Sequence, residues 1–129
     1  MNNMKAIYDK KPSKIEAVGN GSYLYRFNIR EIASDTENNE KYKSWSCDEV
    51  TVWAPISSNK ITEKVISDMW NANYEQKAIN EYNAAQLGMY GDITGEEAKA
   101  KINAYKQFLE AREEIKKRID EDCSELGIR

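Results

Sequence analysis

The most regular pattern in the chain is an apolar stripe over its last third, from Thr94 to Leu126. This segment contains no proline, and its single glycine, Gly95, lies at its start. Apolar residues recur every three or four positions, which places them on one face of a helix. These residues are Ala104, Phe108, Ala111, Ile115, Ile119, Cys123 and Leu126. The spacing predicts one long helix that ends before Gly127 and begins near Gly95, where Thr94 and Glu97 fit a capping box.

In the first half of the chain, apolar and polar side chains alternate with a period of two, which is typical of β-strands. Strand-like segments at residues 5–8 and 15–18 precede a longer one at residues 23–33, and Asn20-Gly21 is a strong signal for a hairpin turn. Four large side chains share one face of the long segment, which we expect to turn towards the core. They are Tyr23, Tyr25, Phe27 and Ile29.

A further strand is predicted at residues 42–53, after a polar connection at residues 34–40 that is expected to be exposed and mobile at its tip. Both faces of this strand carry apolar groups, so the alternation leaves open which face is buried, and a bulge near Cys47 to Glu49 would switch sides. Together the segments predict a meander of three or four antiparallel strands, from about residue 4 to 54, in which neighbours in sequence pair.

Helical spacing begins after Pro55. Ser57, Ser58 and Asn59 offer caps for a helix starting near Lys60, and residues 71–73 predict a break before a second helix that ends at Gly88 and Gly91. The second and third helices are expected to form an antiparallel hairpin. The predicted fold class is therefore α+β, in a single domain 1–129 with strands at about 4–54 and helices at about 58–126.

Composition narrows the class of protein. Charged residues make up 32% of the 129 residues, yet 40% are hydrophobic, which is too much for a disordered chain. The net charge of -3 gives no general attraction to nucleic acid or to an anionic membrane, so neither is an expected partner. No apolar run approaches the ~20 residues of a transmembrane helix, and the first residues lack a secretion signal. We therefore expect a soluble cytoplasmic protein.

Candidate chemistry is sparse. The chain has no histidine, which excludes a Cys/His zinc site and an imidazole base. Cys47 and Cys123 are isolated from each other and are interpreted as reduced, partly buried thiols. Carboxylate pairs such as Glu96-Glu97 and Glu113-Glu114 are expected to point into water. We predict no catalytic residue, no metal site and no cofactor, and an enzyme is a third hypothesis that rests on carboxylates alone.

The aromatic side chains of the predicted sheet are the main candidates for binding. Such residues carry binding energy at protein interfaces and also stack on sugars. A core role is the competing interpretation and is favoured for Tyr25, Phe27 and Trp53. For Tyr42 and Trp45, which flank the polar connection, both interpretations stay open.

The second half of the long helix, from Ile115 to Cys123, is expected to extend past the sheet. There it is covered either by Tyr74 and Ile79 or by a partner. The predicted partner-binding residues are Tyr42, Trp45, Trp53, Ile115 and Ile119.

Several segments of the helical half together resemble small uncharacterised proteins carried by phages and prophages of gut anaerobes. These segments are residues 61–70, 80–90, 105–117 and 122–128. The resemblance implies a phage-encoded, intracellular context and an assembly or accessory role. The leading hypothesis is thus a non-enzymatic protein that binds another protein or itself. The alternative is a small ligand-binding module for a carbohydrate or cell-wall fragment, with Tyr42, Trp45 and Trp53 as stacking platforms.

Overall fold

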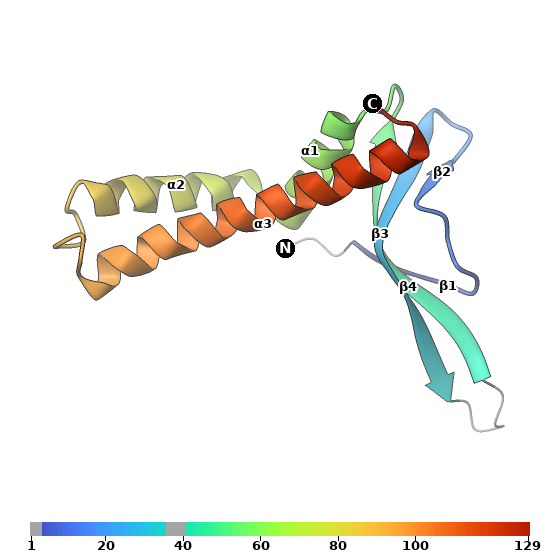
Figure 1. Cartoon of the computed structure of the whole chain (residues 1–129), viewed down its shortest axis with the longest axis horizontal. Coiled ribbons are helices and arrows are strands. Elements are labelled where there is room, and N and C mark those ends of the chain that lie inside the picture. Colours follow the sequence, from blue (N-terminus) through green and yellow to red (C-terminus); the bar gives the residue numbers. More distant parts are fainter. Residues whose placement is uncertain (1–3, 36–40) are drawn as a thin grey trace.

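The computed structural model describes residues 4–35 and 41–129, and at residues 33–35 and 41–43 it describes the backbone alone (Figure 1). Its elements are β1 (Lys5–Tyr8), β2 (Ile15–Ala17), β3 (Ser22–Asp35), β4 (Lys41–Trp53), α1 (Ser58–Met69), α2 (Ala72–Gln86) and α3 (Glu96–Leu126). The predicted α+β class is confirmed. The polar connection predicted at residues 34–40 lies mostly outside the described residues. None of the described helices is long and apolar enough to cross a membrane.

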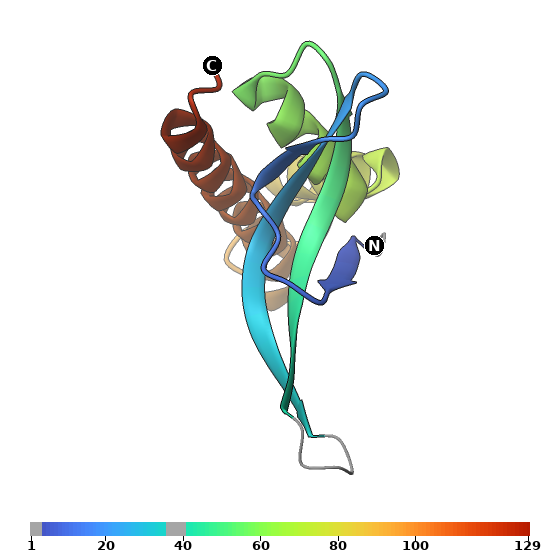
Figure 2. The same ribbon diagram turned by 90° about the vertical axis from the view of Figure 1, so that its right-hand side faces the viewer.

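The four strands form one antiparallel sheet in the order β1-β4-β3-β2. Pairing between neighbours in sequence is confirmed for β2, β3 and β4 but is wrong for β1, which pairs with residues 45–48 of β4. The reason lies in residues 9–14, which contain Pro12 and cross the face of the sheet instead of making a tight turn (Figure 2). This crossing carries the chain from one edge of the sheet to the other.

A register shift between Phe27 and Arg30 divides the β3–β4 pair into two parts. Its cause is an extra residue in β3 rather than the bulge predicted in β4, and Asn28 adopts a φ of 54° there. Asparagine is among the few residues that tolerate this conformation. The side-chain amide nitrogen of Asn28 donates to the carboxylate of Asp48 (2.8 Å). Arg118 of α3 donates to the side-chain carbonyl oxygen of Asn28, so the bulge is fixed to both the sheet and the helix.

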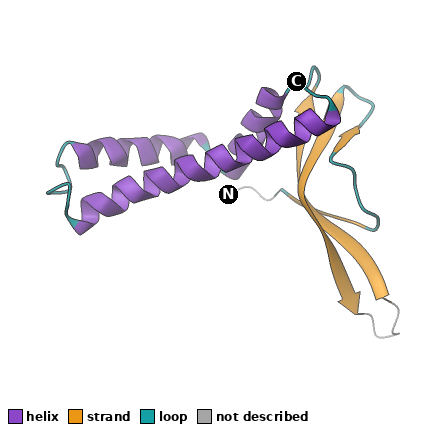
Figure 3. Cartoon of the chain, in the orientation of Figure 1, coloured by secondary structure: helices purple, strands orange, loops and turns teal. Residues whose placement is uncertain are grey.

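The core lies between one face of the sheet and the helices α1 and α3 (Figure 3). Its buried members are Tyr25, Phe27, Val50, Val52, Ile61, Val65, Ile119 and Cys123. Val50 and Val52 settle which face of β4 turns inward. The predicted core positions of Tyr25 and Phe27 are confirmed, whereas Trp53, on the opposite face of β4, is 56% exposed. Hydrophobic character alone did not distinguish the two faces of that strand.

The long helix α3 packs in the reverse of the predicted sense. Its second half lies on the sheet, and its first half extends away from the sheet beside α2 (Figure 1). The expectation that Ile115 to Cys123 would project past the sheet is therefore wrong. Because α1 follows directly on β4 and α2 leads the chain away, α3 has to begin at the far end and return. Small residues such as Ala85 and Ala98 are fully buried in the projecting part, which suits close helix packing.

The helix ends show which of the predicted capping residues are confirmed. Ser57 caps α1 and Asn71 caps α2 through side-chain acceptors, and Gly127 ends α3 with a φ of 76°, as predicted. The capping box at Thr94 is wrong. The hydroxyl of Thr94 donates instead to the carboxylate of Asp92 (2.9 Å), and Gly95 is the N-cap. The helix begins one residue later than the capping box requires, and glycine has no side chain that could accept a backbone amide there.

Candidate interaction groove

The predicted partner-binding residues fall in different parts of the structure. Ile119 is 2% exposed, and Ile115 is partly buried against the same core, so the sheet covers the helix face that was assigned to a partner. This placement corrects the prediction for Ile119, because no surface of that side chain is left for a partner. Of the aromatic members of the predicted set that the structure describes, Trp45 and Trp53 both lie outside the core.

The aromatic residues of β4 do not form one platform. Trp45 and Trp53 share the face of β4 that points away from the helices, but they are eight residues apart, which is about 27 Å along a strand. Trp45 is partly covered, and the amino group of Lys11 lies 5.6 Å from its ring centre. The side chain of Tyr42 lies outside the described residues. No single sugar ring reaches both tryptophans.

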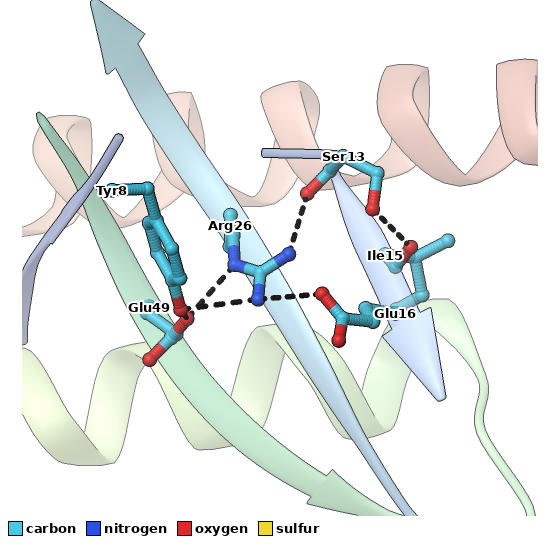
Figure 4. A network of polar contacts seen from close by, with 6 residues as sticks. All are labelled: Tyr8, Ser13, Ile15, Glu16, Arg26 and Glu49. Atoms are coloured by element: carbon cyan, nitrogen blue, oxygen red, sulfur yellow. Dashed lines mark hydrogen bonds and ion pairs between the residues drawn. The ribbon is translucent and has the colours of Figure 1, made fainter. Parts of the chain in front are cut away.

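Arg26 forms a buried polar network on the face of the sheet opposite the helices, a feature that the sequence did not predict (Figure 4). Its guanidinium donates to Glu49 (2.8 Å), to the carbonyl of Ser13 (3.2 Å) and to the hydroxyl of Tyr8 (3.1 Å), and it pairs with Glu16 (2.9 Å). The hydroxyl of Tyr8 donates to Glu49. The ring of Tyr8 also lies 4.6 Å from the guanidinium carbon.

The contacts of Arg26 account for its burial without a ligand. Burial opposes its charge, but the hydrogen bonds to Glu49, Glu16 and Tyr8 outweigh burial and raise its pKa, so it stays charged. Burial and the bond to Glu49 likewise raise the pKa of Tyr8. Each nitrogen of the guanidinium has a partner within the chain. We therefore assign the network to holding residues 9–14 on the sheet.

A groove of about 820 Å³ lies where α1, the start of α2 and the middle of α3 meet. The two long walls are α1 and α3. Ser58 at the start of α1 donates to Asp120, and Trp70, just after its end, contacts Phe108, so α1 runs along α3 from residue 120 towards residue 108. The apolar groups that line the groove are Ile66, Trp70, Phe108 and Leu109.

Aromatic contacts hold α1 against α3 at one end of the groove. The rings of Trp70 and Phe108 meet edge to face at 5.0 Å, and Tyr74 lies 5.6 Å from Phe108. Such pairs stabilise a packed arrangement by about 0.5–1.5 kcal/mol each beyond the burial of their area. Leu109, which also lines the groove, stays 41% exposed. The groove therefore combines a fixed apolar floor with accessible apolar area.

Polar groups on the walls of the groove have unused bonding capacity. The hydroxyl of Thr62 is buried and has no hydrogen-bond partner among the described residues. Arg112 pairs with Glu75 (3.1 Å). Three further charged groups lining the groove make no ion pair within residues 4–35 and 41–129. They are Glu63 of α1 and Glu113 and Lys116 of α3.

Sequence reasoning missed the groove because its residues come from three helices. Leu109 lies outside the apolar stripe of α3, and Trp70 lies just after the end of α1. The one available signal was the pair Phe108-Leu109, which places large apolar groups on two adjacent faces of one helix. The direction in which α1 crosses α3 could not be read from spacing.

No group of three or more cysteine, aspartate and glutamate side chains in the described part of the chain is placed to hold a metal ion. Comparisons with protein-family models, with curated proteins and with solved structures find no match for this chain.

Proposed function

We propose that the chain is a non-enzymatic protein-interaction protein, and that it binds an amphipathic helix of a partner in the groove between α1 and α3. The observation that carries the proposal is the combination of an apolar floor with unpaired charges on both walls. Clefts lined by helices commonly receive the apolar face of a third helix. The accessory or assembly role implied by the resemblance to phage and prophage proteins belongs to this proposal.

The helical walls of the groove favour a helix over a flat surface as its occupant. A third helix packs at 8–10 Å from its neighbours, with its side chains between theirs. Leu109, 41% exposed, would then be covered by the apolar stripe of the partner. Replacement of Leu109 by serine removes apolar contact without opening the core, because the neighbouring Phe108 stays buried.

The charges favour a partner helix with basic residues beside its apolar stripe. Glu63 and Glu113 lie on opposite walls, and each lacks an ion pair within the described chain. Basic groups flanking the stripe would meet one carboxylate on each side. Lys116 then favours a single acidic group on the side of the partner helix that faces α3. This pattern supplies specificity and register more than affinity.

Two other hypotheses receive less support. The carboxylate pairs Glu96-Glu97 and Glu113-Glu114 are exposed, so neither pair has the contrasting environments that general acid and base catalysis needs. The ligand-binding alternative needs adjacent aromatic platforms, and the separation of Trp45 from Trp53 weighs against it.

The proposal is tested by site-specific photocrosslinking in cells that naturally make the protein. A photoreactive residue at position 109 reports on the groove, and one at position 107 is the matched control, since Gln107 is exposed on α3 outside the groove. The captured protein is identified, purified and titrated against the wild-type chain, Leu109→Ser and Gln107→Ser.

We expect crosslinks to one defined helix of the partner at position 109, and binding weakened about tenfold by Leu109→Ser but unchanged by Gln107→Ser. Glu113→Lys should also weaken binding, and more so at low salt. Equal capture at the two positions, or equal affinity of the two serine variants, would count against the groove as a binding site.

A further inference from the structure

The loop between α2 and α3 exposes large apolar side chains at the far end of the helical hairpin (Figure 1). Leu87 is 80% exposed, Met89 is 73% exposed and Ile93 is 45% exposed, all within seven consecutive residues. Scattered exposed hydrophobic residues are normal on protein surfaces, but a group at one projecting tip is characteristic of an interaction site. We call residues 87–93 the apolar tip.

Backbone hydrogen bonds hold the apolar tip in one conformation. The amides of Leu87 and Met89 donate to Asn83 (3.1 Å) and Ala84 (3.0 Å), so the loop continues directly from the last turn of α2. Gly88 and Gly91 adopt φ values of 80° and 90°, which other residues rarely do. The amide of Gly91 donates to the carbonyl of Gly88 (3.1 Å), which closes the turn.

Asp92 fixes the second half of the loop against α3. Its carboxylate accepts from the backbone amide and the hydroxyl of Thr94, both at 2.9 Å, and its carbonyl accepts from Gly95 (2.8 Å). The bonds from Thr94, the backbone amide first, lower the pKa of Asp92, so it is ionised at neutral pH. A loop that is ordered before binding loses little conformational entropy when it docks.

Folding does not explain the exposed side chains. The closest packing in this part of the hairpin uses Ala85 and Ala98, which are fully buried, and the rings of Tyr82 and Tyr105, whose centres are 4.9 Å apart. Leu87 and Met89 leave most of their area in water. Their replacement by serine should therefore leave the stability of the chain nearly unchanged.

The charge around the apolar tip selects among possible partners. Residues 81–101 contain the carboxylates of Glu81, Asp92, Glu96 and Glu97 and the amino groups of Lys99 and Lys101, for a net charge of -2. Lys101 lies over the ring of Tyr90 (5.6 Å) and pairs with Glu81 (3.5 Å), which leaves three carboxylates and one amino group around the tip. Glu96 and Glu97 are exposed in the first turn of α3. An anionic lipid surface is repelled by such a rim. The groove of a second copy is also disfavoured, because two of its three unpaired charges are the carboxylates of Glu63 and Glu113.

We propose that the apolar tip is a second docking surface, which inserts Leu87 and Met89 into an apolar pocket on a partner protein bordered by lysine or arginine side chains. The pocket covers the two most exposed hydrophobic side chains of the described chain. Its basic border meets Asp92, Glu96 and Glu97. This surface is distinct from the groove between α1 and α3, and the two do not depend on each other.

The test combines photocrosslinking with two probes on the purified full chain. A photoreactive residue replaces Met89 in the cells that make the protein, and the same residue at Asn103, exposed on α3, is the control. The captured protein is identified, and its purified form is titrated against the wild type, the double variant Leu87→Ser/Met89→Ser and Val18→Ser, a matched exposed residue on the β2–β3 turn. Sedimentation tests self-association, and flotation with phosphatidylserine vesicles tests membrane binding.

We expect position 89, but not position 103, to crosslink to a protein at a pocket flanked by lysine or arginine. The double variant should weaken that complex about thirtyfold at unchanged melting temperature, while Val18→Ser has no effect. Glu96→Gln/Glu97→Gln should weaken it about fivefold and reduce its salt dependence. Four results would overturn the proposal: equal crosslinking at both positions, a pocket without basic residues, a dimer that the double variant dissolves, or vesicle binding that it abolishes.

Discussion

Arg26→Ala removes the buried guanidinium, and the contacts of this group allow the loss in free energy of unfolding to be estimated. Arg26 is 2% exposed and is bound by Glu49, which is 22% exposed, and by Glu16, which is 53% exposed. Arg26→Ala leaves both carboxylates and the hydroxyl of Tyr8 without their shared cation. Ser13, which anchors residues 9–14, loses its donor as well.

The magnitude follows from the burial of each partner. Breaking a buried ion pair by removing one member costs about 3–5 kcal/mol. Glu49 keeps partial access to water, so the loss of its ion pair with Arg26 should cost an amount near the lower limit of this range. The ion pair of Arg26 with Glu16 is exposed on the side of the carboxylate and is worth about 0–1 kcal/mol. We expect Arg26→Ala to reduce the free energy of unfolding by about 3 kcal/mol and the melting temperature by about 10 °C for a chain of this length.

Urea unfolding followed by tryptophan fluorescence measures this loss, with Arg30→Ala as the matched control. Arg30 lies on the same strand and is exposed, so its replacement should change stability by no more than ~0.5 kcal/mol. Double-mutant cycles should give a larger coupling energy for Arg26 with Glu49 than for Arg26 with Glu16. A loss below about 1 kcal/mol for Arg26→Ala, or equal couplings in the two cycles, would refute the assignment of Arg26 as a structural anchor.

Two further predictions concern buried titratable groups. Burial and the bond to Asp122 (2.6 Å) raise the pKa of Tyr25 far above its usual value, so its contribution is present below about pH 10 and is lost as the pH rises further. The free energy of unfolding should fall more steeply above about pH 10 in the wild type than in Tyr25→Phe, and parallel profiles in urea titrations would contradict this. Cys47 and Cys123 are free thiols, 2% and 1% exposed, and burial raises the pKa of both. Ellman's reagent should therefore react with neither thiol in the native protein at about pH 8 and with both in urea, whereas fast reaction of either native thiol would show an opening that the fold does not have.

The elements of the fold could be predicted from the sequence because their signals are local. The helix that ends at Gly127 and the hairpin at Asn20-Gly21 each depend on residues within one or two turns. The position of Arg26 could not be predicted, since a charged residue on the face opposite Tyr25 indicates exposure. Its burial depends on residues 9–14 crossing that face, which is a contact between distant parts of the chain.

The candidate surfaces also depend on contacts between distant parts of the chain, so the sequence predicts them only in part. Trp53 and Val52 are both apolar, and only the position of α1 and α3 relative to the sheet shows that Val52 is inside. Because the second half of α3 lies on the sheet, Ile119 packs in the core and not against a partner. Leu87 and Met89 lie on either side of Gly88 in a loop, where helical periodicity carries no information about burial. Their exposure became evident only once the loop was seen at the far end of the hairpin.

The two proposed docking surfaces lie on one rigid element, which constrains how they would work together. The helix α3 is continuous from Glu96, beside the apolar tip, to Leu109 and Arg112 in the groove, a distance of about 20 Å. The ion pairs Lys101–Glu81 (3.5 Å) and Arg112–Glu75 (3.1 Å) join α3 to α2 along this length. The hairpin would therefore act as a spacer that sets the separation of two partners, and occupancy of one surface should leave the affinity of the other unchanged.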